Sequence, residues 1–97
     1  MKPTSSPAQR RKQAGAWLKR LREEAGLTQL ELANLLDFKY YAFVSQVETG
    51  FSRVPTEKME AWARSLGVEP RPFVQRLLAH YEPELHRVLY EGKSCPS

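Results

Sequence analysis

Two short helical segments follow one another in the middle of the chain, and they carry the sharpest boundary signals in the sequence. The first begins at Thr28-Gln29-Leu30-Glu31, where a threonine at the N-cap and a glutamate three residues later form a capping box. Its apolar pattern ends near residues 36–37. The second covers about residues 39–49 and ends at Gly50. The chain is therefore built around a pair of short helices joined by only a few residues, the proportions of a helix-turn-helix.

The segment before this pair predicts a long first helix. A serine N-cap, a proline and a glutamine at residues 6–9 mark its start, and Gly26 marks its end. Gly15 lies inside it and costs roughly 1 kcal/mol relative to alanine, so we expect the first turns to fray.

The segments after the pair also predict helices. A fourth helix follows Thr56 and stops at Gly67, and a fifth covers residues 69–81. Pro83 disfavours helix at the preceding residue, so residues 84–90 form either a separate short helix or a kinked continuation. No segment shows the alternation of a strand. The fold class is all-α.

Basic residues are concentrated at the start of the chain. Of 15 Lys and Arg residues, seven lie in residues 1–25 against two glutamates, while the rest of the chain is nearly neutral. A basic first quarter indicates a polyanionic partner, nucleic acid first of all, or else a solvated basic terminus. Composition alone does not separate these two readings.

Several classes of protein do not fit the sequence. The 97 residues suffice for one small domain and contain neither a run of roughly 20 apolar residues nor a signal-peptide pattern, so we expect a cytoplasmic protein. Cys95 lies in a polar tail and is expected to be inert. His80 and His86 lack metal-ligand partners at suitable spacing, and no phosphate loop or nucleophile–base pattern occurs. We therefore expect no enzyme activity, no metal and no cofactor.

The segment at residues 39–49 has two faces on a helical wheel. With Val44 and Val47 inward, Tyr40 falls on the buried side and Tyr41 near its edge. The outward face then carries Lys39, Ala42, Ser45, Gln46 and Thr49. Small and polar side chains of these types suit base edges, thymine methyl groups and phosphates in a DNA groove. An ordinary solvated face is the alternative.

Several short motifs are distributed over most of the chain: Arg22, Gly26-Leu27-Thr28-Gln29, Leu32-Ala33, Val44-Ser45-Gln46-Val47-Glu48, Gly50 and Leu66-Gly67-Val68. Over roughly residues 16–80 they together resemble the phage-repressor and Cro type of helix-turn-helix domain, also called Xre-type or lambda-repressor-like. The resemblance implies a five-helix DNA-binding domain with a central helix-turn-helix and, here, an additional C-terminal helical segment. It also implies a bacterial or phage-encoded protein.

The resemblance further implies roles for individual residues. Gln46 matches a position that reads bases, and the groove-facing set as a whole is Lys39, Tyr41, Ala42, Ser45 and Gln46. The expected phosphate contacts are Thr28, Gln29, Thr49 and Arg53, to which the basic start of the chain adds Arg10 and Arg11. Arg22 and Glu48 match a pair that forms a buried salt bridge and orients the reading helix.

Two departures from the family pattern affect the turn between the paired helices. The stretch between Leu36 and Val44 is one residue longer than usual, so it must form a longer turn or an extra helical residue. Asp37 occupies a position that is often glycine, which is tolerable because aspartate can adopt the left-handed conformation. The extra residue is expected to push the start of the reading helix outward.

We expect three parts: a basic arm over residues 1–12 that partly extends the first helix, the helix-turn-helix domain over residues 13–81, and a helical tail over residues 82–97. The tail carries Leu85, Val88 and Leu89, which we expect to form a homodimer interface. The favoured function is a homodimeric, sequence-specific repressor that binds a palindromic operator in double-stranded DNA. The alternative is an antitoxin-like protein whose tail neutralises a partner protein.

Overall fold

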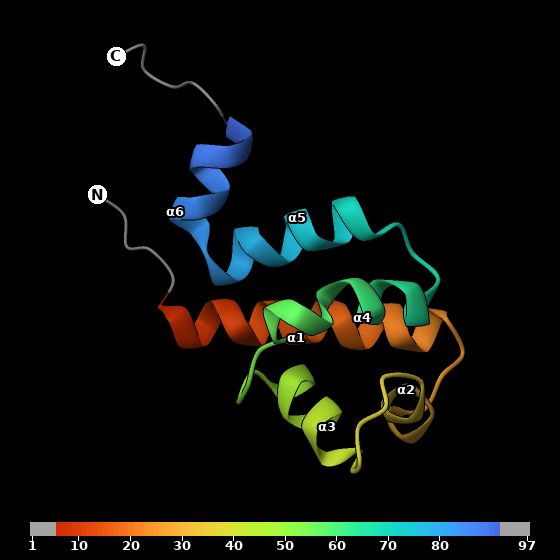
Figure 1. The fold of residues 1–97 in the computed structure, drawn as a ribbon. Helices are drawn as coiled ribbons and strands as arrows, with labels where there is room; N and C mark the ends of the chain where they lie inside the picture. Colours follow the sequence, from red (N-terminus) through yellow and green to blue (C-terminus); the bar gives the residue numbers. More distant parts are fainter. Residues whose placement is uncertain (1–5, 92–97) are drawn as a thin grey trace, which may run out of the picture.

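The computed structural model describes residues 6–91, which fold into helices and turns (Figure 1). In chain order the elements are α1 (Pro7–Glu24), α2 (Gln29–Leu35), α3 (Ala42–Thr49), the 3-10 helix η1 (Thr56–Lys58), α4 (Met59–Leu66), α5 (Pro70–Tyr81), α6 (Pro83–His86) and the π-helix η2 (Arg87–Glu91). This part of the chain has no strand, which confirms the all-α class with five helices and an added C-terminal segment. Cys95 lies outside the described residues.

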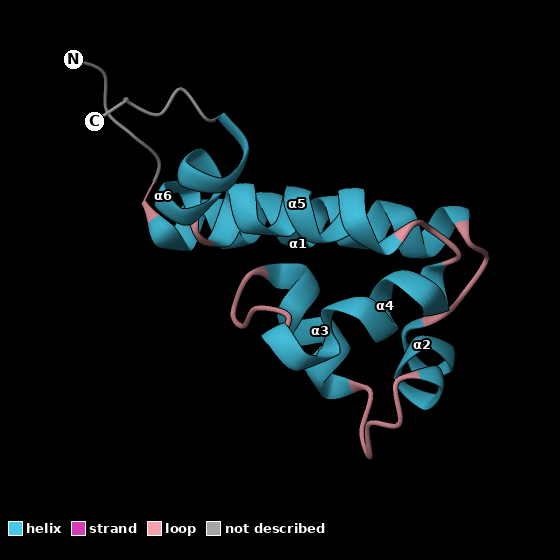
Figure 2. Cartoon of the chain, turned by 45° about the horizontal axis from the view of Figure 1, so that its top comes forward, coloured by secondary structure: helices cyan, strands magenta, loops and turns pink. Residues whose placement is uncertain are grey.

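The helices form two groups around α1. Figure 1 and Figure 2 show α5 beside α1 along one side, with α2 and α3 on the other. The core between them is centred on Trp62 of α4, which is completely buried. It is completed by buried residues from every main helix: Leu18, Leu32, Val44, Val47 and Leu77. Each such side chain contributes about 1.5–3 kcal/mol on burial. None of the helices within residues 6–91 is long and apolar enough to cross a bilayer.

Local sequence signals account for the helix starts. The Ser6 hydroxyl accepts from the Gln9 amide at 3.1 Å, and the Gln9 side chain accepts from the Ser6 amide at 3.3 Å. Thr28 and Glu31 form the same reciprocal pair at 3.0 and 2.8 Å. Both predicted capping boxes are therefore present, and each satisfies two backbone N–H groups that a helix start leaves unpaired.

Gly15 has a different role from the one expected. The helix α1 is continuous from Pro7, so the predicted fraying of its first turns is not seen. Gly15 is buried where α1 crosses α3, and a β-carbon built on it would lie 2.3 Å from the carbonyl oxygen of Glu48. Its missing side chain allows the two helices to approach closely.

The start of α3 was predicted wrongly. The helix begins at Ala42 and not near residue 39, and Tyr40 is 68% exposed instead of buried. Asp37 adopts the left-handed conformation with φ 63°, as its place in the turn predicts. The turn then directs Phe38 inward, where its ring packs against Trp62 and Phe43 at centroid distances of 5.9 and 5.2 Å. Phe38 thus takes the inward place assigned to Tyr40.

The C-terminal segment leaves the body of the domain. The helix α5 ends at Tyr81, and Pro83 begins the separate short helix α6, which is the first of the two expected alternatives. Figure 1 shows α6 and η2 turning away from the axis of α5. None of the residues in these two elements is buried. The segment therefore adds little to the core of its own chain.

Candidate nucleic-acid interface

The outward face of α3 is the centre of the candidate site. Val44 and Val47 are completely buried and fix the helix to the core. On the other side Ala42, Gln46 and Thr49 are exposed and Ser45 is half-buried. Thr49 donates its hydroxyl to the carbonyl of Gln46 at 3.2 Å, but the Gln46 side-chain amide has no hydrogen-bond partner within residues 6–91. A free amide on an exposed helix can offer both a donor and an acceptor to a base edge.

The connection before α3 extends this face. Lys39 and Tyr41 are exposed, and Tyr41 is the residue that precedes the first turn of α3. The Lys39 ammonium lies 5.7 Å from the ring centre of Tyr40. Two tyrosine rings and a lysine therefore border the N-terminal end of α3 on the solvent side.

A buried ion pair holds α3 against α1. Arg22 donates to Glu48 through Nε at 2.7 Å and Nη2 at 3.1 Å, and through Nη1 to the carbonyl of Leu27 at 2.8 Å. The side chains of Arg22 and Glu48 are only 10% and 3% exposed. Hydrogen bonding to Glu48 raises the pKa of Arg22, against the opposing effect of burial. The pair links α1, the turn after it and α3, which sets the orientation of α3.

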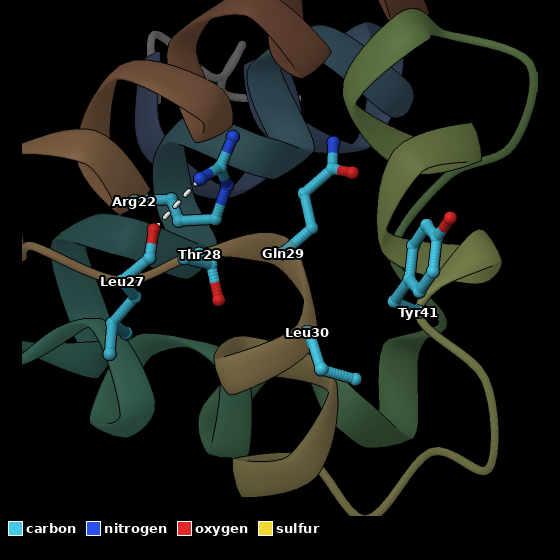
Figure 3. A pocket seen from close by; sticks show the side chains of 6 residues that line it. All are labelled: Arg22, Leu27, Thr28, Gln29, Leu30 and Tyr41. Carbon is cyan, nitrogen blue, oxygen red and sulfur yellow. Dashed lines mark hydrogen bonds between the residues drawn. The ribbon is translucent and has the colours of Figure 1, made fainter.

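Gln29 is joined to this ion pair. Its Nε2 donates to Oε1 of Glu48 at 3.0 Å, and its second N–H has no acceptor among the residues that the structure describes. A pocket of about 360 Å³ opens beside it, and Figure 3 shows Gln29 and Leu30 from α2 on one side and Tyr41 on the other. Thr28 also lines the pocket, although its hydroxyl already accepts from Glu31.

Arg53 has partners within the chain. Its Nη1 lies 2.8 Å from Oε2 of Glu82, and its guanidinium lies 4.5 Å from the ring centre of Tyr81. The Tyr81 hydroxyl in turn accepts from the Val54 amide at 3.2 Å, and burial raises the pKa of Tyr81. The loop after α3 is thereby tied to the junction between α5 and α6, a link that no sequence pattern indicated.

Arg10 and Arg11 are also engaged. Arg10 Nε donates to the carbonyl of His80 in the last turn of α5, and Arg11 Nε donates to the carbonyl of Gly50 after α3, each at 3.1 Å. Cations near helix C-termini interact favourably with the carbonyls that remain there. Residues 7–12 are turns of α1 that brace two other helices, so this part of the expected arm extends the first helix.

The tail residues expected at a dimer interface lie apart from this face. Leu85, Val88 and Leu89 are 47%, 65% and 55% exposed. They sit on α6 and η2, beyond the C-terminal end of α5 (Figure 1). The structure thus brings together the α3 face, its preceding turn and Gln29, and leaves the tail as a second, separate surface.

The described part of the chain contains no group of three or more His, Cys, Asp or Glu residues that could hold a metal ion.

Comparison with known proteins finds one family. A family model described as a helix-turn-helix domain matches residues 13–77, about two thirds of the 97-residue chain. The match begins within α1, extends through most of α5 and includes both helices of the candidate site. A search of curated proteins finds no match.

Proposed function

The chain belongs over residues 13–77 to the helix-turn-helix domain family, and we propose that it is a sequence-specific, homodimeric DNA-binding repressor. The observation that carries the proposal is the outward face of α3. It presents the exposed amide of Gln46, which has no hydrogen-bond partner within residues 6–91, among small side chains, while buried valines on the other face hold the helix in place. In this motif the second helix enters the major groove and reads base edges near its N-terminal end.

Base reading is assigned to Lys39, Tyr41, Ala42, Ser45 and Gln46. Positioning on the DNA phosphate backbone is assigned to Thr28, Gln29, Thr49 and Arg53. Arg10 and Arg11 contribute through the guanidinium groups that brace α3 and α5. Such phosphate contacts supply affinity and register but little sequence selectivity. The ion pair of Arg22 and Glu48 keeps the reading helix at a fixed angle to the rest of the domain.

Residues 13–81 then serve as the DNA-binding unit and residues 82–97 as the segment for association. Two copies would present two reading helices to half-sites about one helical turn apart, which favours a palindromic operator. A bound dimer would repress by covering the start of a gene.

The test begins with duplexes selected by the full-length protein from a random pool. Gln46→Ala should weaken binding to the selected duplex by roughly 1–3 kcal/mol and leave binding to random duplex nearly unchanged. Gln75→Ala, on α5 and outside the proposed interface, is the matched control and should change neither. Equal losses on both duplexes would make Gln46 a backbone contact or a scaffold residue. Failure to enrich any sequence would contradict sequence-specific binding itself.

The exposed tail also supports a second candidate, an antitoxin-like protein. Its apolar residues are uncovered in a single chain and could meet a different protein as well as a second copy. Leu85→Asp combined with Leu89→Asp distinguishes the two, because carboxylates are costly to bury. A folded monomer with steeply reduced operator affinity supports the homodimer. A variant that stays dimeric and keeps its affinity favours the antitoxin-like alternative.

A further inference from the structure

A second concave surface lies between α1 and α5, away from the DNA-binding face. It has a volume of about 250 Å³ and is lined mainly by Trp17, Leu21, Val68, Pro72, Phe73 and Arg76. The rings of Trp17 and Phe73 pack at 5.4 Å, and the Arg76 guanidinium lies 4.8 Å above Trp17. No residue of α2 or α3 lines this groove, so DNA reading leaves it unused.

The described part of the tail, residues 82–91, and the groove lie at opposite ends of α5. The groove includes the turn before α5 and its first turns, whereas the tail follows its last residue, Tyr81 (Figure 1). A helix of 12 residues is about 18 Å long. Because α6 begins beyond the far end of α5 and no residue of α6 or η2 lines the groove, residues 83–91 do not cover the groove of their own chain.

We infer that residues 83–91 of one copy dock in the α1–α5 groove of a second copy. This rests on the proposed homodimer and specifies its interface. If the two α5 helices run antiparallel, a two-fold axis places each tail at the groove end of its partner. Two identical tail–groove contacts then close the dimer, and no open surface remains to extend it into a filament.

The two surfaces are complementary in chemistry. The tail offers Leu85, Val88, Leu89 and Tyr90, all more than 40% exposed, and the groove offers two aromatic rings and aliphatic side chains. An amphipathic helix in an apolar groove is a recurring mode of recognition.

Their charges are complementary as well. Residues 82–91 contain three glutamates against one arginine. Arg76 lines the groove, exposed Arg71 lies in the same first turns of α5, and exposed Arg20 lies one turn from Trp17 on α1. Glu69 is the one acidic residue in the groove lining. This charge pattern favours the acidic tail of a second copy over a basic partner.

The test uses the full chain and measures mass by sedimentation velocity. Pro72→Glu places a carboxylate at an exposed groove position in the first turn of α5, where acidic residues suit the helix. It should convert the dimer to a monomer, and Arg76→Glu, also exposed, should do the same. Leu35→Glu, an exposed apolar-to-acidic change on α2, is the matched control and should stay dimeric. Circular dichroism must show wild-type helix content in each variant.

Mixing provides the decisive step. A chain with Leu85→Asp and Leu89→Asp keeps its groove, and a Pro72→Glu chain keeps its tail, so one of the two contacts survives in a mixed pair. Each variant alone should be monomeric, while the mixture at high concentration should form a species of dimer mass. Acrylamide should then quench Trp17 less than in either variant alone, since Trp62 is fully buried throughout.

Three results would overturn the inference. If the Pro72→Glu protein is dimeric while the protein with Leu85→Asp and Leu89→Asp is monomeric, tails pair with tails. That result leaves the proposed homodimer intact. A mixture that stays monomeric would exclude reciprocal tail–groove exchange. A wild-type chain that remains monomeric with and without its selected duplex would remove the homodimer and this interface together.

Discussion

Gly15 of α1 faces the carbonyl oxygen of Glu48 on α3 so closely that a β-carbon at Gly15 would lie 2.3 Å from it. The carbonyls of Val47 and Glu48 are both backbone groups, so no side-chain rotation can relieve the contact. The residue that weakens α1 as an isolated helix is therefore the one that permits it to pack on α3.

Replacing Gly15 by alanine should consequently destabilise the protein. In an exposed helix this change would gain about 1 kcal/mol, but here an overpacking cost of about 3 kcal/mol should outweigh that gain and lower the free energy of unfolding by about 2 kcal/mol. Chemical denaturation measures the effect. Gly67→Ala is a useful comparison, because Gly67 has φ +75° and a β-carbon there would have no neighbour within 4 Å. This substitution should cost about 1–2 kcal/mol, which comes from the left-handed backbone conformation alone. A stabilised Gly15→Ala protein would mean that the two helices lie further apart.

Much of the fold follows from local signals in the sequence. Capping boxes at Ser6 and Thr28 and glycines at 26, 50 and 67 place most helix ends within a residue or two. The beginning of α3 could not be placed in this way, because the residues before Ala42 also fit a helical wheel. Packing of Phe38 on Trp62 decides that boundary, and such a contact between distant elements leaves no local trace.

The partners of the basic residues could not be predicted from the sequence either. Arg10 and Arg11 donate to backbone carbonyls 70 and 39 residues away, and no side-chain pattern marks a carbonyl as an acceptor. Glu82, the partner of Arg53, is 29 residues distant. The Arg22–Glu48 pair was accessible only through the family resemblance. The assignment of individual residues to bases and phosphates stays a prediction.

Arg22→Ala should lower the free energy of unfolding by about 3–5 kcal/mol, since it leaves the carboxylate of Glu48 buried and uncompensated. Replacing Arg22 and Glu48 together by methionine should cost much less, because neither charge then remains in the interior. Thermal and chemical denaturation of the three proteins provide the comparison. Retained stability in Arg22→Ala with loss of DNA binding would instead make Arg22 a direct DNA contact.

His80 should make stability depend on pH. Burial, with a smaller effect of Arg76, lowers the pKa of His80 below 6.5, and its Nε2 is buried without a partner in the described part of the chain. The unfolded chain therefore binds a proton more readily than the folded one. As far as His80 is concerned, the free energy of unfolding should have its full value above pH 6.5 and should fall as the pH drops below 6.5.

Denaturation between pH 7.5 and about 5.5 tests this on either side of the unperturbed histidine pKa. His80→Gln should flatten the dependence, whereas His86→Gln on α6 should retain it. If the slope survived in His80→Gln, another group would be responsible.

Arg53 and Glu82 should have opposite effects on DNA affinity. Their side chains are 33% and 48% exposed, so the ion pair itself contributes little more than about 1 kcal/mol to stability and either residue can be changed without unfolding the domain. If Arg53 contacts a phosphate, Arg53→Ala should weaken binding to selected and random duplex alike and reduce the salt dependence by about one counterion. Glu82→Gln should do the reverse, since it removes the carboxylate that competes with the phosphate.

The matched control is Glu84→Gln, which changes a neighbouring glutamate that pairs with Arg87 and does not touch Arg53. It removes the same charge from the tail, so any gain in affinity common to both glutamine variants reports general electrostatics. Only the excess in Glu82→Gln measures release of Arg53. If Arg53→Ala left the salt slope unchanged, Arg53 would be a brace between the loop after α3 and the end of α5, held there by Glu82 and Tyr81, with no phosphate contact to lose.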